Sequence, residues 1–179
     1  NHISLENIDV KNDNRRSLGI YSIDNIENDK AIKLSDIIED DDGEIYEEGA
    51  QNAVPLEDEP IINETNIGLV RKNGYWIFRG RVNYNQNDKE LFKDFNIRAI
   101  PPKDVVNYDE HIVPWDVVKR KIPEAIDFYS SPNEDFIVVV THAGLQMFFV
   151  DNGQIVSTKA VNEIDLPKNT SIVMAEWAT

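Results

Sequence analysis

The stretch IGLVRKNGYWIFRGRV, residues 67–82, decides the fold class of this chain. Two apolar runs flank Asn73-Gly74, a dipeptide that favours a two-residue hairpin turn because both residues tolerate a positive φ. Successive side chains of a strand point to opposite faces, so the run YWIF that follows the turn carries apolar side chains on both faces. The stretch therefore predicts an antiparallel hairpin whose second strand is covered on both sides.

Further strands are expected on the C-terminal side of this hairpin. Residues 134–161 contain apolar runs separated by turns at residues 142–144 and at Asn152-Gly153, a pattern that indicates an antiparallel meander. The stretch SPNEDFIVVVTHAGLQMFFVDNGQIV, residues 131–156, resembles one blade of a β-propeller in its opening Ser-Pro-Asn, its aromatic strand and its Asp-Asn-Gly turn. This resemblance implies an antiparallel meander and carries no activity with it.

The rest of the chain adds shorter elements. Pro114 fits the first turn of a helix within residues 111–129, with a second short turn at 124–129. Other strands are expected at residues 17–24, 31–38, 44–47, 94–100 and 170–177, with a polar loop at 83–88. We predict an α+β, mostly β fold, with antiparallel meander sheets of about eight strands and one or two short helices packed on one face.

Charge is distributed unevenly along the chain. Residues 1–68 contain 18 acidic and five basic residues, whereas residues 69–179 contain 15 acidic and 13 basic residues. Residues 1–16 are too polar to offset the cost of ordering, so we expect a tether or disordered terminus. Residues 17–179 are expected to form a single β-rich domain. The sequence leaves open whether residues 17–68 are a separate acidic subdomain or add strands to the main sheet.

Composition excludes several classes of function. The 179 residues include no cysteine, which rules out disulfides, zinc–thiolate sites, iron–sulfur clusters and a cysteine nucleophile. A net charge of −15 repels a phosphate backbone, so we expect no nucleic-acid partner. There is no run of 18 apolar residues that would predict a transmembrane segment. The oligomeric state is left open.

One acidic segment is a candidate metal site. Asp40, Asp42 and Glu44 surround Gly43 in a pattern that partly matches an EF-hand loop, although the first and last ligand positions of that loop do not fit. These three residues are the candidate calcium ligands, and the alternative is a solvated acidic turn. No other cofactor is expected.

Three ring-bearing residues are candidate binding residues. Trp76, Trp115 and His111 could line a ligand groove, or they could belong to the core, as aromatic side chains more often do. The sequence has neither a nucleophile elbow nor a glycine-rich phosphate loop, so it nominates no catalytic residue. The cations of the hairpin, Arg71, Lys72, Arg79 and Arg81, are expected to pair with the acidic first segment.

We therefore expect a non-enzymatic binding domain whose partner is an unknown protein or envelope ligand. The lack of cysteine and the abundance of Asn, Asp, Ile and Lys are typical of exported bacterial domains, so an extracytoplasmic or cell-surface location is expected, such as the soluble part of a surface lipoprotein. A cytoplasmic location is the alternative. Two other functions remain open: a hydrolase of an envelope polymer or phosphoester that uses carboxylates with His111 or His142, and an acidic inhibitor or immunity protein.

Overall fold

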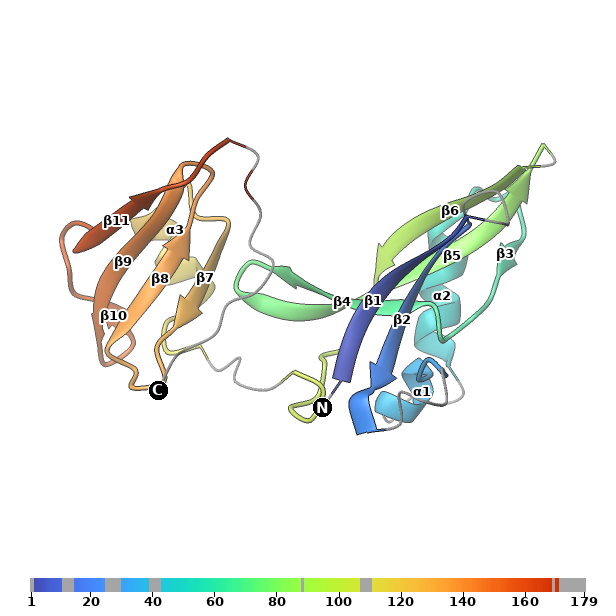
Figure 1. The fold of residues 1–179 in the computed structure, drawn as a ribbon, viewed down its shortest axis with the longest axis horizontal. Coiled ribbons are helices and arrows are strands. Elements are labelled where there is room, and N and C mark those ends of the chain that lie inside the picture. The colour runs from blue at the N-terminus through green and yellow to red at the C-terminus, as the bar shows by residue number, and fades with distance from the viewer. Residues whose placement is uncertain are drawn as a thin grey trace. The chain divides into compact units, whose positions relative to one another are not determined.

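The computed structural model describes residues 2–10, 15–24, 30–38, 43–87, 89–106, 111–168 and 170. The chain divides into two compact units (Figure 1). Unit 1 comprises residues 1–70 and 76–107, and unit 2 comprises residues 71–75 and 108–179. The elements are β1 (His2–Asp9), β2 (Arg15–Ser22), α1 (Leu34–Ile37), α2 (Glu44–Ala53), β3 (Pro60–Ile61), β4 (Ile67–Lys72), β5 (Tyr75–Gln86), β6 (Lys89–Asn96), α3 (Trp115–Lys121), β7 (Asp127–Ser130), β8 (Phe136–Val140), β9 (Gly144–Asp151), β10 (Gln154–Ile155) and β11 (Asn162–Asp165).

The predicted mostly β, antiparallel class is confirmed, but the strands do not form one eight-stranded meander. In the described part of the chain they form three small sheets. One is the β1–β2 hairpin, one has the order β3-β5-β4 with β6 also paired to β5, and one has the order β10-β9-β8-β7 with β11 also paired to β9.

The hairpin of β4 and β5 is confirmed, and its turn has the predicted positive φ angles at Asn73 (56°) and Gly74 (84°). The polar loop expected at residues 83–88 is wrong for its first part, since β5 continues to Gln86. Pairing explains this extension. Strand β3 is paired to Asn83 on one side of β5, while β6 is paired along residues 79–86 on the other.

Two of the predicted strands are helices. Residues 31–38 contain α1, and the strand expected at 44–47 is the first part of α2. Tyr46 and Ala50 lie four residues apart, so a helix places both on one face, and both are fully buried there. Gly43 precedes α2 with a φ of 81°, a left-handed conformation that glycine adopts without strain.

Helix α2 packs closely on β5 and β6 because a phenylalanine ring fills the space between two glycines. A Cβ atom at either Gly49 of α2 or Gly80 of β5 would overlap the ring of Phe95. Tyr46 meets the same ring edge-on, with 5.3 Å between centroids. The Tyr46 hydroxyl also donates a hydrogen bond of 2.7 Å to the Arg81 carbonyl oxygen. These contacts join the helix to the sheet.

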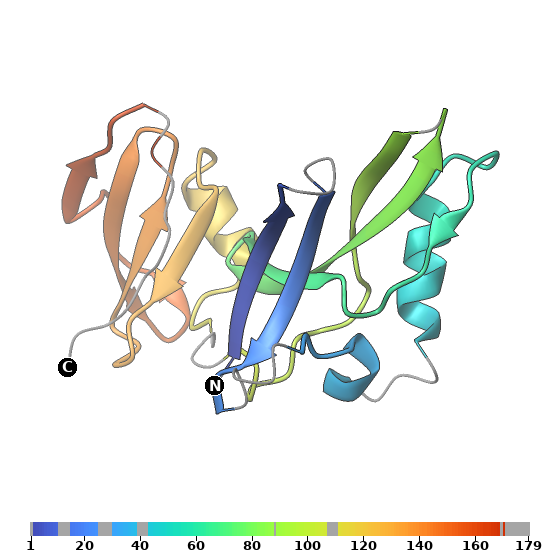
Figure 2. The same cartoon turned by 45° about the vertical axis from the view of Figure 1, so that its right-hand side comes forward.

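The segment expected to be a tether contributes a strand. Residues 2–9 form β1, which pairs along its whole length with β2. The β1–β2 hairpin is attached to β4, because the Leu69 amide donates to Ser4 Oγ (2.9 Å), and to the residue before β4, because the Leu18 amide donates to Asn66 Oδ1 (2.7 Å). Figures 1 and 2 show β5 and β6 lying between this hairpin and α2. The described parts of residues 17–68 therefore share unit 1 with β5 and β6.

Unit 2 contains the antiparallel meander that the propeller-blade resemblance implies, with the order β7, β8, β9 and β10. Pro114, expected in the first turn of this helix, lies one position earlier as the N-terminal cap of α3, and residues 124–129 lead into β7 instead of continuing the helix. Val118 of α3 packs into a core that includes Phe128, Ile137 and Val139. The strand expected at 170–177 lies, except for Thr170, outside the described residues. In the part of the chain that the structure describes, no helix has the length and apolar character needed to span a membrane.

Candidate functional site

The two faces of β5 differ in chemistry. Phe78, Val82 and Tyr84 are buried in the core on the α2 side. Because side chains alternate along a strand, Arg79, Arg81 and Asn83 point to the opposite face, beneath the β1–β2 hairpin. Arg81 and Asn83 are nevertheless only 5% and 4% exposed. Unit 1 therefore buries a polar strip under this hairpin.

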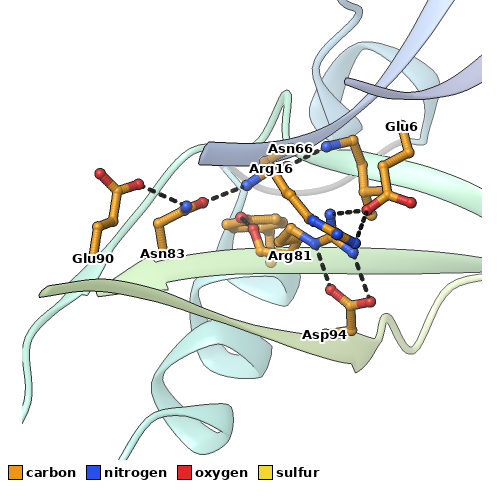
Figure 3. A network of polar contacts seen from close by, with 9 residues as sticks. Glu6, Arg16, Asn66, Arg81, Asn83, Glu90 and Asp94 are labelled. Carbon is orange, nitrogen blue, oxygen red and sulfur yellow. Dashed lines mark hydrogen bonds and ion pairs between the residues drawn. The ribbon is translucent and has the colours of Figure 1, made fainter. Parts of the chain in front are cut away.

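Arg81 is the centre of this strip (Figure 3). Its Nε and Nη2 atoms donate to the two carboxylate oxygens of Asp94 on β6, at 2.6 and 3.0 Å, and its Nη1 atom donates to Glu6 Oε1 on β1 at 2.7 Å. The guanidinium also lies over the ring of Phe92, 4.3 Å from its centroid. The hydrogen bonds that Arg81 donates to Asp94 raise the pKa of Arg81 more than burial lowers it. Arg81 is therefore a fixed, charged group.

Neighbouring polar residues extend the network along the strip. Asn66 Nδ2 donates to Asn83 Oδ1 at 3.0 Å, and Asn83 Nδ2 donates to Glu90 Oε1 at 2.8 Å. Glu90 also forms an ion pair of 2.9 Å with Arg15 at the start of β2. The network thus connects β2, β5 and β6, and it is joined to Arg81 by the hydrogen bond of 2.9 Å that the Arg81 amide donates to the Asn66 carbonyl oxygen.

A groove of about 420 Å³ opens beside the strip, between the β1–β2 hairpin and the sheet. Its volume is typical of ligand sites, which range from roughly 300 to 1,000 Å³. Three guanidinium groups line it, those of Arg16, Arg79 and Arg81, together with the carboxylates of Glu6 and Asp94. The charged side chains of the lining therefore sum to +1, in a chain whose net charge is −15.

The arginines of the groove differ in how well they are paired. In the β5–β6 register Arg81 lies opposite Asp94, whereas Arg79 lies opposite the neutral Asn96. Arg79 forms no ion pair with any residue in the part of the chain that the structure describes. Arg16 lies 3.8 Å from Glu6 Oε1, an oxygen that already accepts a hydrogen bond from Arg81. Arg79 is therefore the cation of the groove with the greatest capacity for an external anion.

The groove also has apolar walls. Leu5 on β1 and Phe92 on β6 both line it, and they are 40% and 39% exposed. Large apolar side chains at this level of exposure can bury further surface when a ligand binds. The groove thus combines a cation that lacks an ion-pair partner among the described residues with apolar surface on two strands.

The residues singled out from the sequence lie elsewhere. His111 and Trp115 both contact Phe128 in unit 2, with ring centroids 4.4 and 6.0 Å away. His111 also meets Tyr75 edge-on at 4.5 Å. Trp76 is half-buried on β5 and belongs to unit 1. The structure therefore brings two of the three candidate binding residues together, around one core phenylalanine.

Within the described residues, the expected pairing of the β4–β5 hairpin cations with the acidic first segment holds for Arg81 but not for Arg79, which forms no ion pair there. Arg81 pairs with Glu6 of the acidic first segment, as expected. Arg71 instead pairs within unit 2, where its Nε atom donates to Asp127 Oδ2 at 3.0 Å and its Nη2 atom donates to the Phe128 carbonyl oxygen at 3.0 Å. Arg71 thus binds a backbone oxygen of β7.

Two of the three candidate calcium ligands, Asp40 and Asp42, lie outside the described residues. Glu44 is the first residue of α2. Within the described ranges, no group of three or more His, Asp or Glu side chains is placed to hold a metal ion.

No protein-family model, no curated protein and no solved structure matches this chain. The groove of unit 1 was not identified from the sequence. The signal available there was the alternation of Arg79 and Arg81 on one face of a strand that is apolar on its other face.

Proposed function

We propose that this protein is a non-enzymatic binding domain and that the groove of unit 1 is its ligand site. The observation that carries this proposal is the position of Arg79, which lines the groove without an ion-pair partner among the described residues, next to Arg81, which has two. A site whose charged groups are already oriented loses little conformational entropy on binding. The hydrogen bonds between Arg81 and its two carboxylate partners fix the orientation of these charged groups before a ligand binds.

We further propose an extracytoplasmic or cell-surface location, with a protein or another envelope component as the ligand. The composition supports this location, since the chain lacks cysteine and is rich in Asn, Asp, Ile and Lys. Fractionation of the cells that make the protein tests the location directly. Recovery with the cytoplasmic fraction would contradict it.

Site-specific photocrosslinking in the source cells tests the binding function. A photoreactive amino acid replaces Leu5, which is 40% exposed in the groove, or Ile62, which is 42% exposed in unit 1 and does not line it. We expect a discrete adduct from position 5 and none from position 62. Equal adduct yields from the two positions, or none from position 5, would refute the site.

The same experiment tests the non-enzymatic part of the proposal. The crosslinked ligand, once identified, is incubated with the purified full-length protein, and its mass is followed over time. An unchanged mass is expected. Conversion of the ligand by the protein, absent from a heat-denatured control, would show that the protein is an enzyme.

A further inference from the structure

Resting on this proposed function, we infer that the ligand is an extended acidic peptide segment of a partner protein. It presents one side-chain carboxylate to Arg79 and an adjoining apolar side chain to Leu5 and Phe92. Three features of the groove support this assignment: the pairing of its arginines, its apolar walls and its local charge.

The pairing of the arginines indicates which chemical group of the ligand would bind Arg79. Arg81 shows how this strip binds an anion, because its guanidinium holds Asp94 through two hydrogen bonds of 2.6 and 3.0 Å. Arg79 lies two residues away on the same face, and its cross-strand neighbour Asn96 offers no negative charge. A guanidinium presents a planar pair of donors that matches a carboxylate. A carboxylate from outside therefore supplies at Arg79 what Asp94 supplies at Arg81.

Arg16 adds a second donor on the opposite wall of the groove. It belongs to β2, and its 3.8 Å contact with Glu6 is too long for a strong hydrogen bond. Glu6 already binds Arg81 at 2.7 Å. A ligand carboxylate at Arg79 can therefore recruit Arg16 without breaking the pairs that hold Arg81 in place.

The apolar walls indicate a ligand larger than a simple anion. Leu5 and Phe92 come from different strands and remain about 40% exposed. A small inorganic anion would leave this surface in water, whereas a peptide side chain next to the carboxylate would cover it. In an extended peptide, side chains two residues apart lie on the same face, so one face supplies both the carboxylate and the apolar side chain.

The net charge of the chain sets a limit on the ligand. A total of −15 repels polyacidic partners at long range. At physiological ionic strength this repulsion is screened within about 8 Å, whereas a direct contact with Arg79 is not. The groove therefore favours a segment with one carboxylate flanked by neutral and apolar residues.

The test uses the full-length protein and the probe acetyl-Gly-Leu-Ser-Glu-Gly-amide, with a twin peptide that carries Gln in place of Glu. Binding is followed by nuclear magnetic resonance of the arginine side-chain Nε–Hε groups. We expect the Glu peptide to shift the Arg79 signal in a saturable way and to bind about tenfold or more tightly than the Gln peptide, since a charge-assisted pair is lost.

Three variants link the effect to the groove. Arg79→Gln is expected to weaken the Glu peptide about tenfold or more, and Arg79→Lys less, because lysine keeps the charge but not the planar donor pair. Arg98→Gln is the control, since Arg98 lies in unit 1, is 88% exposed and does not line the groove. Its affinity is expected to match that of the unmodified protein. Thermal melting confirms that each variant is folded.

The outcomes separate this inference from the proposed function. Equal binding of the Glu and Gln peptides, or no shift at Arg79, would overturn the carboxylate assignment. An equal response to inorganic phosphate or succinate would overturn the peptide assignment. If Leu5 gives its crosslink and Arg79→Gln leaves the yield unchanged, the inference fails and the binding function stands. If Leu5 gives no crosslink, the binding function itself fails.

Discussion

Removal of the buried cation Arg81 should destabilise unit 1 less than removal of the two carboxylates around it. The Arg81 side chain is 6% exposed, whereas those of Glu6 and Asp94 are 43% and 30% exposed. After Arg81→Met, both carboxylates remain accessible to water. After the double change Glu6→Gln and Asp94→Asn, a buried guanidinium remains charged without its anions.

The magnitudes follow from these exposures. Arg81→Met removes the buried charge, leaves two carboxylates that water can reach and retains the apolar stem, so we expect it to change the free energy of unfolding by about 1 kcal/mol or less. Loss of the partners of a buried charge costs about 3–5 kcal/mol. We expect about 2–4 kcal/mol for Glu6→Gln with Asp94→Asn, because both carboxylates are partly hydrated and the new amides still accept hydrogen bonds.

Amide hydrogen exchange of β5, measured in the full-length protein, reports the stability of unit 1 without interference from unit 2. Arg120→Met is the control, since Arg120 is 73% exposed in unit 2 and should leave β5 exchange unchanged. If Arg81→Met costs as much as the double carboxylate variant, the argument from unequal burial is refuted.

Three further predictions concern other contacts. Burial raises the pKa of Tyr46, and nearby negative charge raises it by a smaller amount. The resulting contribution to the free energy of unfolding is complete below pH about 10 and is lost as the pH rises from there through the folded-state pKa, at up to about 1.4 kcal/mol per pH unit. In urea titrations at alkaline pH, the free energy of unfolding should therefore fall less steeply with pH for Tyr46→Phe. Gly80→Ala should cost about 1–3 kcal/mol by overlap with Phe95, and Phe95→Leu in the same chain should recover part of this loss in urea melts. Arg71→Gln should speed amide exchange in β7 and β8 by a factor that corresponds to about 2–4 kcal/mol, because the carboxylate of Asp127, which is 16% exposed, loses its cation. Unchanged exchange rates in these two strands would contradict a stabilising role of this ion pair.

Local patterns were sufficient to predict the hairpin of β4 and β5. The Asn73-Gly74 turn depends on the φ preferences of two adjacent residues, which the sequence shows directly. The start of a helix beside Pro114 was predictable for the same reason, to within one residue. Each of these features is determined by residues close together in the chain.

Helix α2 and strand β1 depend on distant residues and were not predicted. The helix buries only Tyr46 and Ala50 among its ten residues, and Gly49 weakens its intrinsic propensity. Gly49 is explained only by the ring of Phe95, which comes from a strand more than 40 residues later. Likewise, the polar strand β1 is held by pairing with β2 and by the bond from Arg81 to Glu6, which joins residues 75 positions apart.

The candidate site was only partly visible in the sequence. The expectation that hairpin arginines pair with the acidic first segment is met by Arg81 and Glu6. The contrast between Arg79 and Arg81 depends on the register of β5 and β6, which places Asp94 beside one arginine and Asn96 beside the other. A register shift of two residues would place Asp94 opposite Arg79 instead of Arg81, so composition and spacing alone could not reveal which arginine is left for a ligand.

The two units are interleaved along the chain, which affects how a gene that encodes them could be cut or recombined. Residues 71–75 belong to unit 2, yet the chain on both sides of them belongs to unit 1. Neither unit is therefore a continuous segment of the chain that recombination or truncation could transfer intact. A fragment that begins at residue 108 would lack Arg71, which binds the Phe128 carbonyl of β7. Such a fragment would leave the Asp127 carboxylate and the Phe128 carbonyl of β7 without this cation, and unit 2 would be less stable for that reason.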